Sequence, residues 1–253
     1  MAAPTDSADP ADGSPHHWMA ANNRAPIAEA MRTLVPPASA AAQGLALEIG
    51  SGTGAQLEAL AETYPGLSWR PSEYCAGQSV VRGFYEQGAD GPDPGHPVEK
   101  VRGLADLDAV LGKYSNVLPA VELDGSAPYD SWPSSVVDSG PGAYALIFCS
   151  NVVHIAPWAV AEGIFAGAGR ALRAGGSLVF HGPYKRDGKC EGMGHEQLWD
   201  EQMRSFGKDW GIRDVDDMAA EAAKHGMRLA TTEHPIGPAK NFLLQFVKEA
   251  AKQ

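Results

Sequence analysis

Residues 45–54 read LALEIGSGTG, and this stretch decides the fold. Its first half is a short apolar run typical of a buried strand, and its second half places Gly50, Gly52 and Gly54 at alternate positions. Glycine allows a tight turn and lets a ligand approach the backbone, because it has no Cβ. A helix expected over 55–63 then offers free N–H groups to polar or anionic ligand atoms. We predict a ligand-binding loop; the alternative is a tight turn that binds nothing.

The rest of the chain alternates strands and helices around this unit. Strands are expected over 67–74, 116–124, 144–152 and 177–184, the last after a turn at Gly175-Gly176, and helices over 16–35, 157–173 and 215–226. This alternation predicts an α/β fold with a mostly parallel sheet and helices on both faces. Two final strands, over 227–235 and 240–250, have no helix between them, which predicts an antiparallel edge.

The domain organisation follows from composition along the chain. Residues 1–15 hold almost nothing to bury and are expected to form a disordered tail. Residues 16–253 are expected to form a single domain. Residues 86–113 are predicted to be an insertion on it, turn-rich at first and with a short helix over 101–112.

Charge and cysteine content exclude several classes of partner. The chain has 20 basic and 31 acidic residues, a net charge of −11, so nucleic acid and anionic membranes are disfavoured as partners. Three widely spaced cysteines and no ligand-spaced cluster predict neither a disulfide framework nor a metal site. No apolar run is long enough to span a bilayer, and no leader is evident, so a cytoplasmic location is expected. The sequence does not indicate an oligomeric state.

The second strand adds a carboxylate to the glycine loop. Glu73 ends this strand 19 residues after Gly54, a spacing suited to binding a ribose diol. A solvated carboxylate at a strand end is the alternative. Asp124 ends the third strand and is a candidate neighbour of adenine, or else a surface turn residue before Gly125.

Several motifs in register resemble one family. The segments LEIGSGTG (47–54), WRPSE (69–73), FCSNVVHIAPW (148–158), HGPYKRDG (181–188) and WGIRD (210–214) resemble the group catalogued as domain of unknown function 938, whose animal member is methyltransferase-like protein 26. NNRAPI (22–27) and PAKN (238–241) match this group in part. The resemblance implies a class I methyltransferase fold with seven strands, the last antiparallel, and S-adenosylmethionine as cofactor. It implies little about the substrate.

Three departures from the family pattern concern the region where a substrate lid is expected. His195 or Glu196 stands where the family has an amide, and Lys240 replaces an asparagine. The 86–113 segment is also longer than the family's usual connection. We therefore expect a substrate that differs from that of ordinary members.

The segment after the fourth strand carries the candidate catalytic group. His154 is a candidate general base because the pKa of histidine lies near neutrality. A histidine that only shapes the site is the alternative. Asn151 is a candidate contact of the methionine part of the cofactor, or else a strand-end cap.

Candidate substrate contacts come from four segments. They are Asn23 and Arg24 in the N-terminal arm, Trp158, His181 and Tyr184 after the central strands, His195, and Arg213. Arg24 would bind a carboxylate, with a surface ion pair as the alternative. Packing is the alternative for Trp158 and Tyr184, and Arg213-Asp214 looks partly structural, with Asp214 capping a helix.

Together these observations predict a methyltransferase that uses S-adenosylmethionine and methylates a small-molecule N, O or S nucleophile by in-line displacement. The expected cofactor contacts are Glu48, Gly50, Gly52, Gly54, Glu73, Asp124 and Asn151. One alternative is a non-catalytic cofactor-binding or scaffold protein. An NAD-dependent oxidoreductase is less favoured, because the loop lacks the third glycine of GxGxxG. A protein or RNA methyltransferase is a further alternative, and charge disfavours RNA.

Overall fold

The computed structural model describes residues 18–75, 103–190 and 200–250, apart from 202, 206, 208 and 237–240. Its main sheet contains β1 (Gly44–Ile49), β2 (Leu67–Glu73), β3 (Val121–Glu122), β4 (Tyr144–Ser150), β5 (Leu172–Gly182), β9 (Met227–Ile236) and β10 (Asn241–Lys248). A second, three-stranded sheet contains β6 (Tyr184–Arg186), β7 (Lys189–Cys190) and β8 (Arg213–Asp214). The sequence did not predict this smaller sheet.

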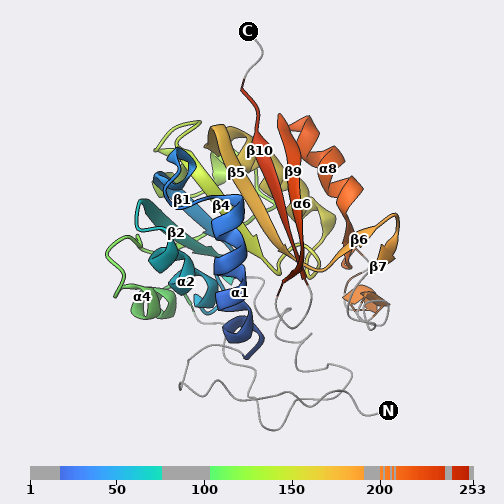
Figure 1. The fold of residues 1–253 in the computed structure, drawn as a ribbon, viewed down its shortest axis with the longest axis horizontal. Helices are drawn as coiled ribbons and strands as arrows, with labels where there is room; N and C mark the ends of the chain where they lie inside the picture. The colour runs from blue at the N-terminus through green and yellow to red at the C-terminus, as the bar shows by residue number, and fades with distance from the viewer. Residues whose placement is uncertain are drawn as a thin grey trace.

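Helices precede and follow the strands of the main sheet (Figure 1). They are α1 (Trp18–Leu34), α2 (Ala55–Thr63), α4 (Leu104–Leu111), α5 (Ser134–Val137), α6 (Trp158–Ala171) and α8 (Val215–Lys224), with 3-10 turns at Ala40–Ala42 and Tyr129–Ser131. Among these described helices, none is both long and apolar enough to cross a bilayer.

The main sheet has the order β3-β2-β1-β4-β5-β10-β9. Strands β1 to β5 pair in parallel, and β10 pairs antiparallel with both β5 and β9. The predicted α/β fold with an antiparallel last strand is therefore confirmed. The closing pair of strands also forms an antiparallel edge, as predicted, with β9 outermost and β10 between β5 and β9. The inner position of β10 agrees with the burial of its first six residues.

The strand order reverses between the neighbouring strands β1 and β4. From β1 the chain adds β2 and β3 on one side, and β4 and β5 then follow on the other side. In open α/β sheets, ligands bind at the carboxyl ends of the strands at such a reversal. The glycine loop follows β1 at this position. The topology thus places the loop where a ligand site is expected.

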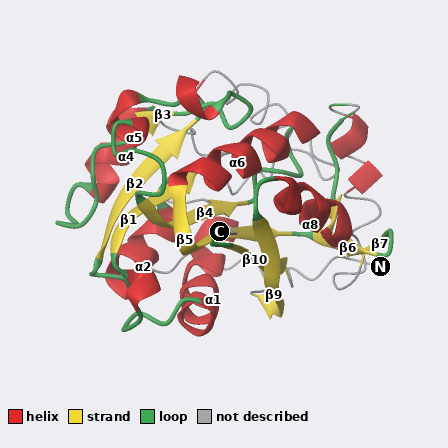
Figure 2. Cartoon of the chain, turned by 90° about the horizontal axis from the view of Figure 1, so that it is seen from above, coloured by secondary structure: helices red, strands yellow, loops and turns green. Residues whose placement is uncertain are grey.

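The two faces of the sheet carry separate hydrophobic clusters. Helices α6 and α8 cover one face, and α1 and α2 cover the other (Figure 2). The α6/α8 face includes Phe165, Phe180 and Phe246, whose ring centroids lie 5.1 to 6.1 Å apart. The α1/α2 face includes the stripe Ile27, Met31 and Val35, as the helical spacing predicts. Membership of one cluster or the other shows which helices each buried strand residue faces.

Three expected strands differ from the observed ones because of local backbone chemistry. The strand predicted over 116–124 is only two residues long, since Pro119 has no N–H to donate. The strand predicted over 144–152 ends at Ser150, because Asn151 has φ +55. Strand β5 begins at Leu172 and passes through Gly175-Gly176 with a register shift, and it ends before Pro183.

Part of the predicted insertion is described. The helix expected over 101–112 is observed as α4, whose Leu107 and Leu111 are buried in the α1/α2 cluster. Residues 86–102 of the insertion and the tail 1–15 lie outside the described residues.

Candidate functional site

The glycine loop between β1 and α2 has a backbone that only glycine adopts easily. Gly50, Gly52 and Gly54 have φ values of +73, +55 and +85. A Cβ added to Gly50 would overlap the Val152 side chain, whereas a Cβ on Gly52 would meet nothing within 4 Å. Gly50 is therefore required by its neighbour. The space beside Gly52 is open, so this part of the turn is not covered by the described side chains.

The carboxylate of Glu73 joins this loop from the end of β2. Its Oε2 accepts a hydrogen bond of 2.7 Å from the Gly52 N–H, and its Oε1 accepts one of 3.0 Å from the Tyr74 N–H. Burial raises the pKa of Glu73, and these two hydrogen bonds counteract the rise in part. Each carboxylate oxygen has a second lone pair, so Glu73 retains capacity for hydroxyl donors.

A row of polar side chains lies on the α1/α2 face where the strands end. Side chains alternate across a strand, so Glu48 follows Ala46, His181 follows Val179, and Asn241 precedes Leu243 on this face. On α1, Asn23 continues the stripe of Ile27 and Met31 by one turn. The apolar rows of helix and strands thus give way to polar residues at the same end.

Three members of this row contain buried polar atoms without a hydrogen-bond partner. Among the described residues these are Asn23 Oδ1, Glu48 Oε2 and His181 Nε2, in side chains that are 1–3% exposed. Buried polar groups are nearly always paired, and leaving one unpaired costs about 1–3 kcal/mol. These atoms therefore indicate a place for a polar ligand or water.

Burial also shifts the protonation of this row. Desolvation raises the pKa of Glu48 to about 7, against a hydrogen bond from Ser51 that lowers it. Burial, and secondarily nearby His154, lower the pKa of His181 to about 3. His181 Nδ1 lies 2.9 Å from Ser150 Oγ. The histidine is neutral at pH 7, and a nearby cation would favour the ionised form of Glu48.

His154 and Asn151 meet across Gly182. A Cβ on Gly182 would lie 3.4 Å from His154 Nδ1 and 3.6 Å from Asn151 Oδ1, so both polar side chains lie beside Gly182. The Asn151 N–H donates to the His181 carbonyl at 2.8 Å, which holds its left-handed backbone in place. Burial, and secondarily the Arg213 charge, lower the pKa of His154 to about 3.

The predicted substrate contacts Arg213 and Trp158 form a structural unit. The Arg213 guanidinium donates to the carbonyls of Val153, Ala156 and Asp209 at 2.6 to 2.9 Å. It also lies 5.5 Å from the centroid of the Trp158 ring. Arg213 therefore fixes the segment that carries His154, and the partly structural interpretation of this residue fits. Asp214 caps α8 by accepting from the Asp216 N–H, as predicted.

The remaining predicted residues lie apart from the polar row. Arg24 points to the outer side of α2 and pairs with Glu58 at 2.9 Å. Tyr184 is buried on the α6/α8 face, and its hydroxyl has no partner among the described residues. Asp124 accepts from the Ser126 N–H and hydroxyl, as a local turn does. His195 lies outside the described residues.

Sequence reasoning missed Ser150 and Asn241 as members of the polar row. Ser150 interrupts an apolar strand just before Asn151, and Asn241 continues the alternation of Leu243 and Gln245. The alternation was a usable signal for both, once the face of each strand was known. Within the described ranges, no group of three His, Cys, Asp or Glu side chains is arranged to hold a metal ion.

Comparisons with known proteins agree with this architecture. A sequence profile of the family described as "Protein of unknown function (DUF938)" matches residues 95–248. The chain is similar in structure to mitomycin 7-O-methyltransferase MmcR, with TM-score 0.59 and 13% identity over 91% of this chain and 54% of that one. The O-methyltransferase NcsB1 from neocarzinostatin biosynthesis, in complex with S-adenosyl-L-homocysteine and 1,4-dihydroxy-2-naphthoic acid, gives TM-score 0.53 and 16% identity over 88% of this chain and 56% of that one.

A third similar structure is human N-acetylserotonin methyltransferase in complex with S-adenosylmethionine, with TM-score 0.56 and 14% identity over 87% of this chain and 51% of that one. At these identities the similarity establishes the fold, which is the Rossmann-like fold of class I methyltransferases. The chain spans about half the length of these three solved structures.

Proposed function

The chain belongs to the family described as protein of unknown function, DUF938, and from this premise we propose that it is a methyltransferase that uses S-adenosylmethionine. The observation that carries the proposal is the glycine loop at the strand-order reversal, with the Glu73 carboxylate bonded to its Gly52 N–H. The narrower likeness to methyltransferase-like protein 26 stays a prediction.

The residues present fit this cofactor. In the proposal, Glu73 accepts hydrogen bonds from the ribose hydroxyls, using the lone pairs that Gly52 and Tyr74 leave free. Glu48 and Asn23 offer unpartnered oxygens, which suit the ammonium of the methionine part. Asp124 remains a proposed neighbour of adenine, and Asn151 of the methionine part.

The chemistry needs little from the protein beyond alignment. S-adenosylmethionine supplies an activated methyl group when bound, so the surrounding residues bind, orient and exclude water. His154 is neutral, and its pKa of about 3 makes it a weak base at neutral pH. We assign it to accepting a hydrogen bond from the acceptor's nucleophilic group, which orients that group. His181, whose Nε2 has no partner among the described residues, is proposed to lie where the acceptor and the methionine part of the cofactor meet. Tyr184 is buried on the other face, so its contact with the acceptor stays a prediction.

The proposed acceptor is a small molecule with an O, N or S nucleophile. Support comes from the three similar solved structures, which are an O-methyltransferase from neocarzinostatin biosynthesis, mitomycin 7-O-methyltransferase and human N-acetylserotonin methyltransferase. The net charge of −11 favours a small molecule over RNA as acceptor.

The test begins with ligand binding. Calorimetry and thermal unfolding with S-adenosylmethionine, S-adenosylhomocysteine and NAD should give binding and a raised Tm for the first two ligands only. A stabilisation by NAD alone would overturn the proposal in favour of an oxidoreductase. Binding without transfer of labelled methyl to any member of a phenol, amine and thiol panel would favour the non-catalytic alternative.

A matched pair of variants tests the site. Glu73→Ala should weaken S-adenosylhomocysteine binding by about 1–3 kcal/mol, because hydrogen bonds to a charged group are lost. Glu122→Ala is the control, since Glu122 is paired in register with Glu73 on β3 but is exposed. Equal affinities of the two variants would remove Glu73 from the site.

A further inference from the structure

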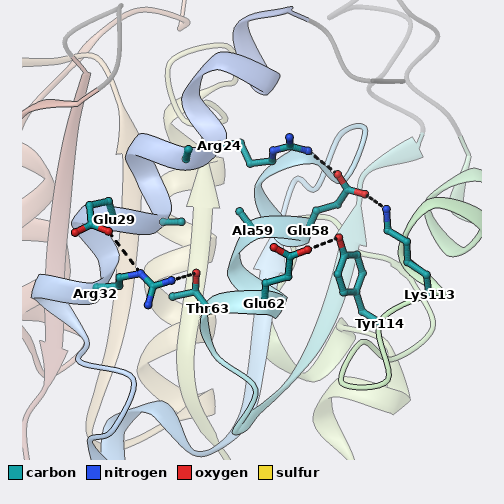
Figure 3. A pocket seen from close by; sticks show the side chains of 11 residues that line it. Arg24, Glu29, Arg32, Glu58, Ala59, Glu62, Thr63, Lys113 and Tyr114 are labelled. Carbon is teal, nitrogen blue, oxygen red and sulfur yellow. Dashed lines mark hydrogen bonds and ion pairs between the residues drawn. The ribbon is translucent and has the colours of Figure 1, made fainter. Parts of the chain in front are cut away.

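Glu58 lies directly behind the glycine loop and joins three elements. It stands in the first turn of α2, where its N–H donates to the Gly54 carbonyl at 3.0 Å. Its side chain is only 8% exposed. One carboxylate oxygen pairs with Arg24 of α1 at 2.9 Å, and the other pairs with Lys113 after α4 at 2.7 Å (Figure 3). The carboxylate thus bridges α1, α2 and the end of α4.

Both cationic partners are next to residues that reach the ligand side. Arg24 follows Asn23, whose buried Oδ1 has no partner among the described residues. Lys113 follows Leu111 by two residues, and Leu111 Cγ lies 3.2 Å from the position of a Cβ on Gly54. An ion pair that holds Arg24 therefore also positions Asn23 in the polar row. The ion pair that holds Lys113 likewise positions Leu111 against the glycine loop.

The first half of α1 depends on such external contacts. Pro26 lies inside the helix and has no N–H, so the hydrogen bond to the Asn22 carbonyl is missing. The segment before it is held by Arg24 and by a 3.3 Å hydrogen bond from Gln56 of α2 to the Ala20 carbonyl. Both contacts come from the first turn of α2.

We propose that Glu58 is a positioning residue for the cofactor site, which holds the first half of α1 and the end of α4 against the glycine loop. The inference rests on the proposed function, because the ligand whose binding it supports is S-adenosylmethionine. Glu58 itself points away from the polar row and into a groove of about 520 Å³ between α1, α2 and the 113–114 turn. It acts through Asn23 and Leu111.

The other acidic residues of this groove provide the contrast. Glu62 lies one turn further along α2 and accepts from the Tyr114 hydroxyl at 3.1 Å, with no ion pair to α1 among the described contacts. Glu29 is 82% exposed and pairs only within α1, with Arg32 at 3.6 Å. Glu62→Gln is therefore a matched control, since it changes the same residue type in the same groove without releasing α1.

Calorimetry with S-adenosylhomocysteine tests the proposal. Glu58→Gln should weaken binding about tenfold, because two partly exposed ion pairs are lost together, and Glu62→Gln should stay within about twofold of the parent chain. Arg24→Met should weaken binding less than Glu58→Gln. The double variant should weaken binding by less than the sum of the two single effects, because Arg24 and Glu58 share the ion pair at 2.9 Å. All variants are measured well below their Tm.

Hydrogen exchange separates this inference from the proposed function, because it needs no ligand. Glu58→Gln should speed exchange in residues 20–26 and 110–114 relative to Glu62→Gln. Unchanged exchange there, or S-adenosylhomocysteine binding as tight as in Glu62→Gln, would overturn the positioning role. If the parent chain binds no S-adenosylhomocysteine, the proposed function fails. The cofactor role of Glu58 fails with it, even if exchange changes as expected.

Discussion

The two faces of the central sheet differ where its parallel strands end. On the α1/α2 face, Asn23, Glu48 and His181 are buried with unpartnered polar atoms. On the α6/α8 face, Arg213 donates to three carbonyls and Asp214 caps a helix, so their hydrogen-bonding capacity is used within the protein. The contrast concerns these residues and not every group on each face, since the buried hydroxyls of Tyr129 and Tyr184 on the α6/α8 face are also unpartnered among the described residues.

The largest expected change in stability distinguishes Phe180 from His181, which are adjacent on β5 and point to opposite faces of the sheet. Phe180→Ala should lower the free energy of unfolding by about 3–5 kcal/mol, because it empties the cluster with Phe165 and Phe246. His181→Ala should cost no more than about 1 kcal/mol, since it loses one hydrogen bond and removes an unpartnered nitrogen. Denaturant unfolding measures both.

Ligand affinity should follow the opposite order for this pair. S-adenosylhomocysteine binding should weaken in His181→Ala and persist in Phe180→Ala at a temperature where both are folded. Equal loss of affinity in the two variants would contradict the assignment of ligand contacts to the α1/α2 face.

The next largest effect concerns the loop where the two faces meet. Gly50→Ala should destabilise the protein by about 2–4 kcal/mol, because the added Cβ overlaps Val152 and φ is +73. Gly140→Ala is the control: its φ is +85 but the space around it is open, so only about 1 kcal/mol is expected. Urea unfolding of both variants measures the difference. Equal losses of unfolding free energy would show that the Val152 side chain can move away from the added Cβ.

Glu48 should make stability depend on pH in a defined direction. Burial raises its pKa from 4.5 to about 7, so the folded state holds a proton that the unfolded state loses between these values. The parent chain therefore loses stability relative to Glu48→Gln as pH rises from about 4.5 to 7, by about 2–3 kcal/mol. Unfolding of both proteins across this range measures the gap. A gap independent of pH would mean that Glu48 titrates normally.

The smallest expected effect is the removal of Asp214 near the α6/α8 face, whose carboxylate is already hydrogen-bonded within the protein. Asp214→Ala should lower the free energy of unfolding by about 1–2 kcal/mol, because it removes the cap of α8 and an acceptor for the Gly188 N–H. Affinity for S-adenosylhomocysteine should stay unchanged by calorimetry. A marked loss of affinity would place this region in the ligand site and weaken the distinction between the faces.

The sequence predicted the fold well where local chemistry decides it. The helix over 55–63, the loop glycines and the apolar strand from Tyr144 follow from propensity and patterning over short windows. The position of β10 between β5 and β9 depends on pairing between distant segments, which no local pattern contains. The length of β3 was overestimated, although Pro119 was a visible warning.

The candidate site was predictable in part for the same reason. Glu73 follows from a spacing along the chain, and its bond to Gly52 agrees with that spacing. The pairing of Arg24 with Glu58 joins residues 34 positions apart, so the sequence alone could not reveal it. The three carbonyls bound by Arg213 are likewise a property of the folded backbone. The motif containing Arg213 indicated a functional or structural role for this residue, but it did not show that the guanidinium binds backbone carbonyls.

The interior position of β10 has a consequence for protein synthesis. Strand β9 joins the main sheet through β10, whose pairing with β5 spans residues 242–247. A growing chain can form the β1–β5 pairs early, but it cannot close the sheet until residue 248 has left the ribosome. Until then β5 exposes an unpaired edge of a kind that recruits other chains. A truncation before Asn241 should therefore yield aggregates rather than a smaller folded protein.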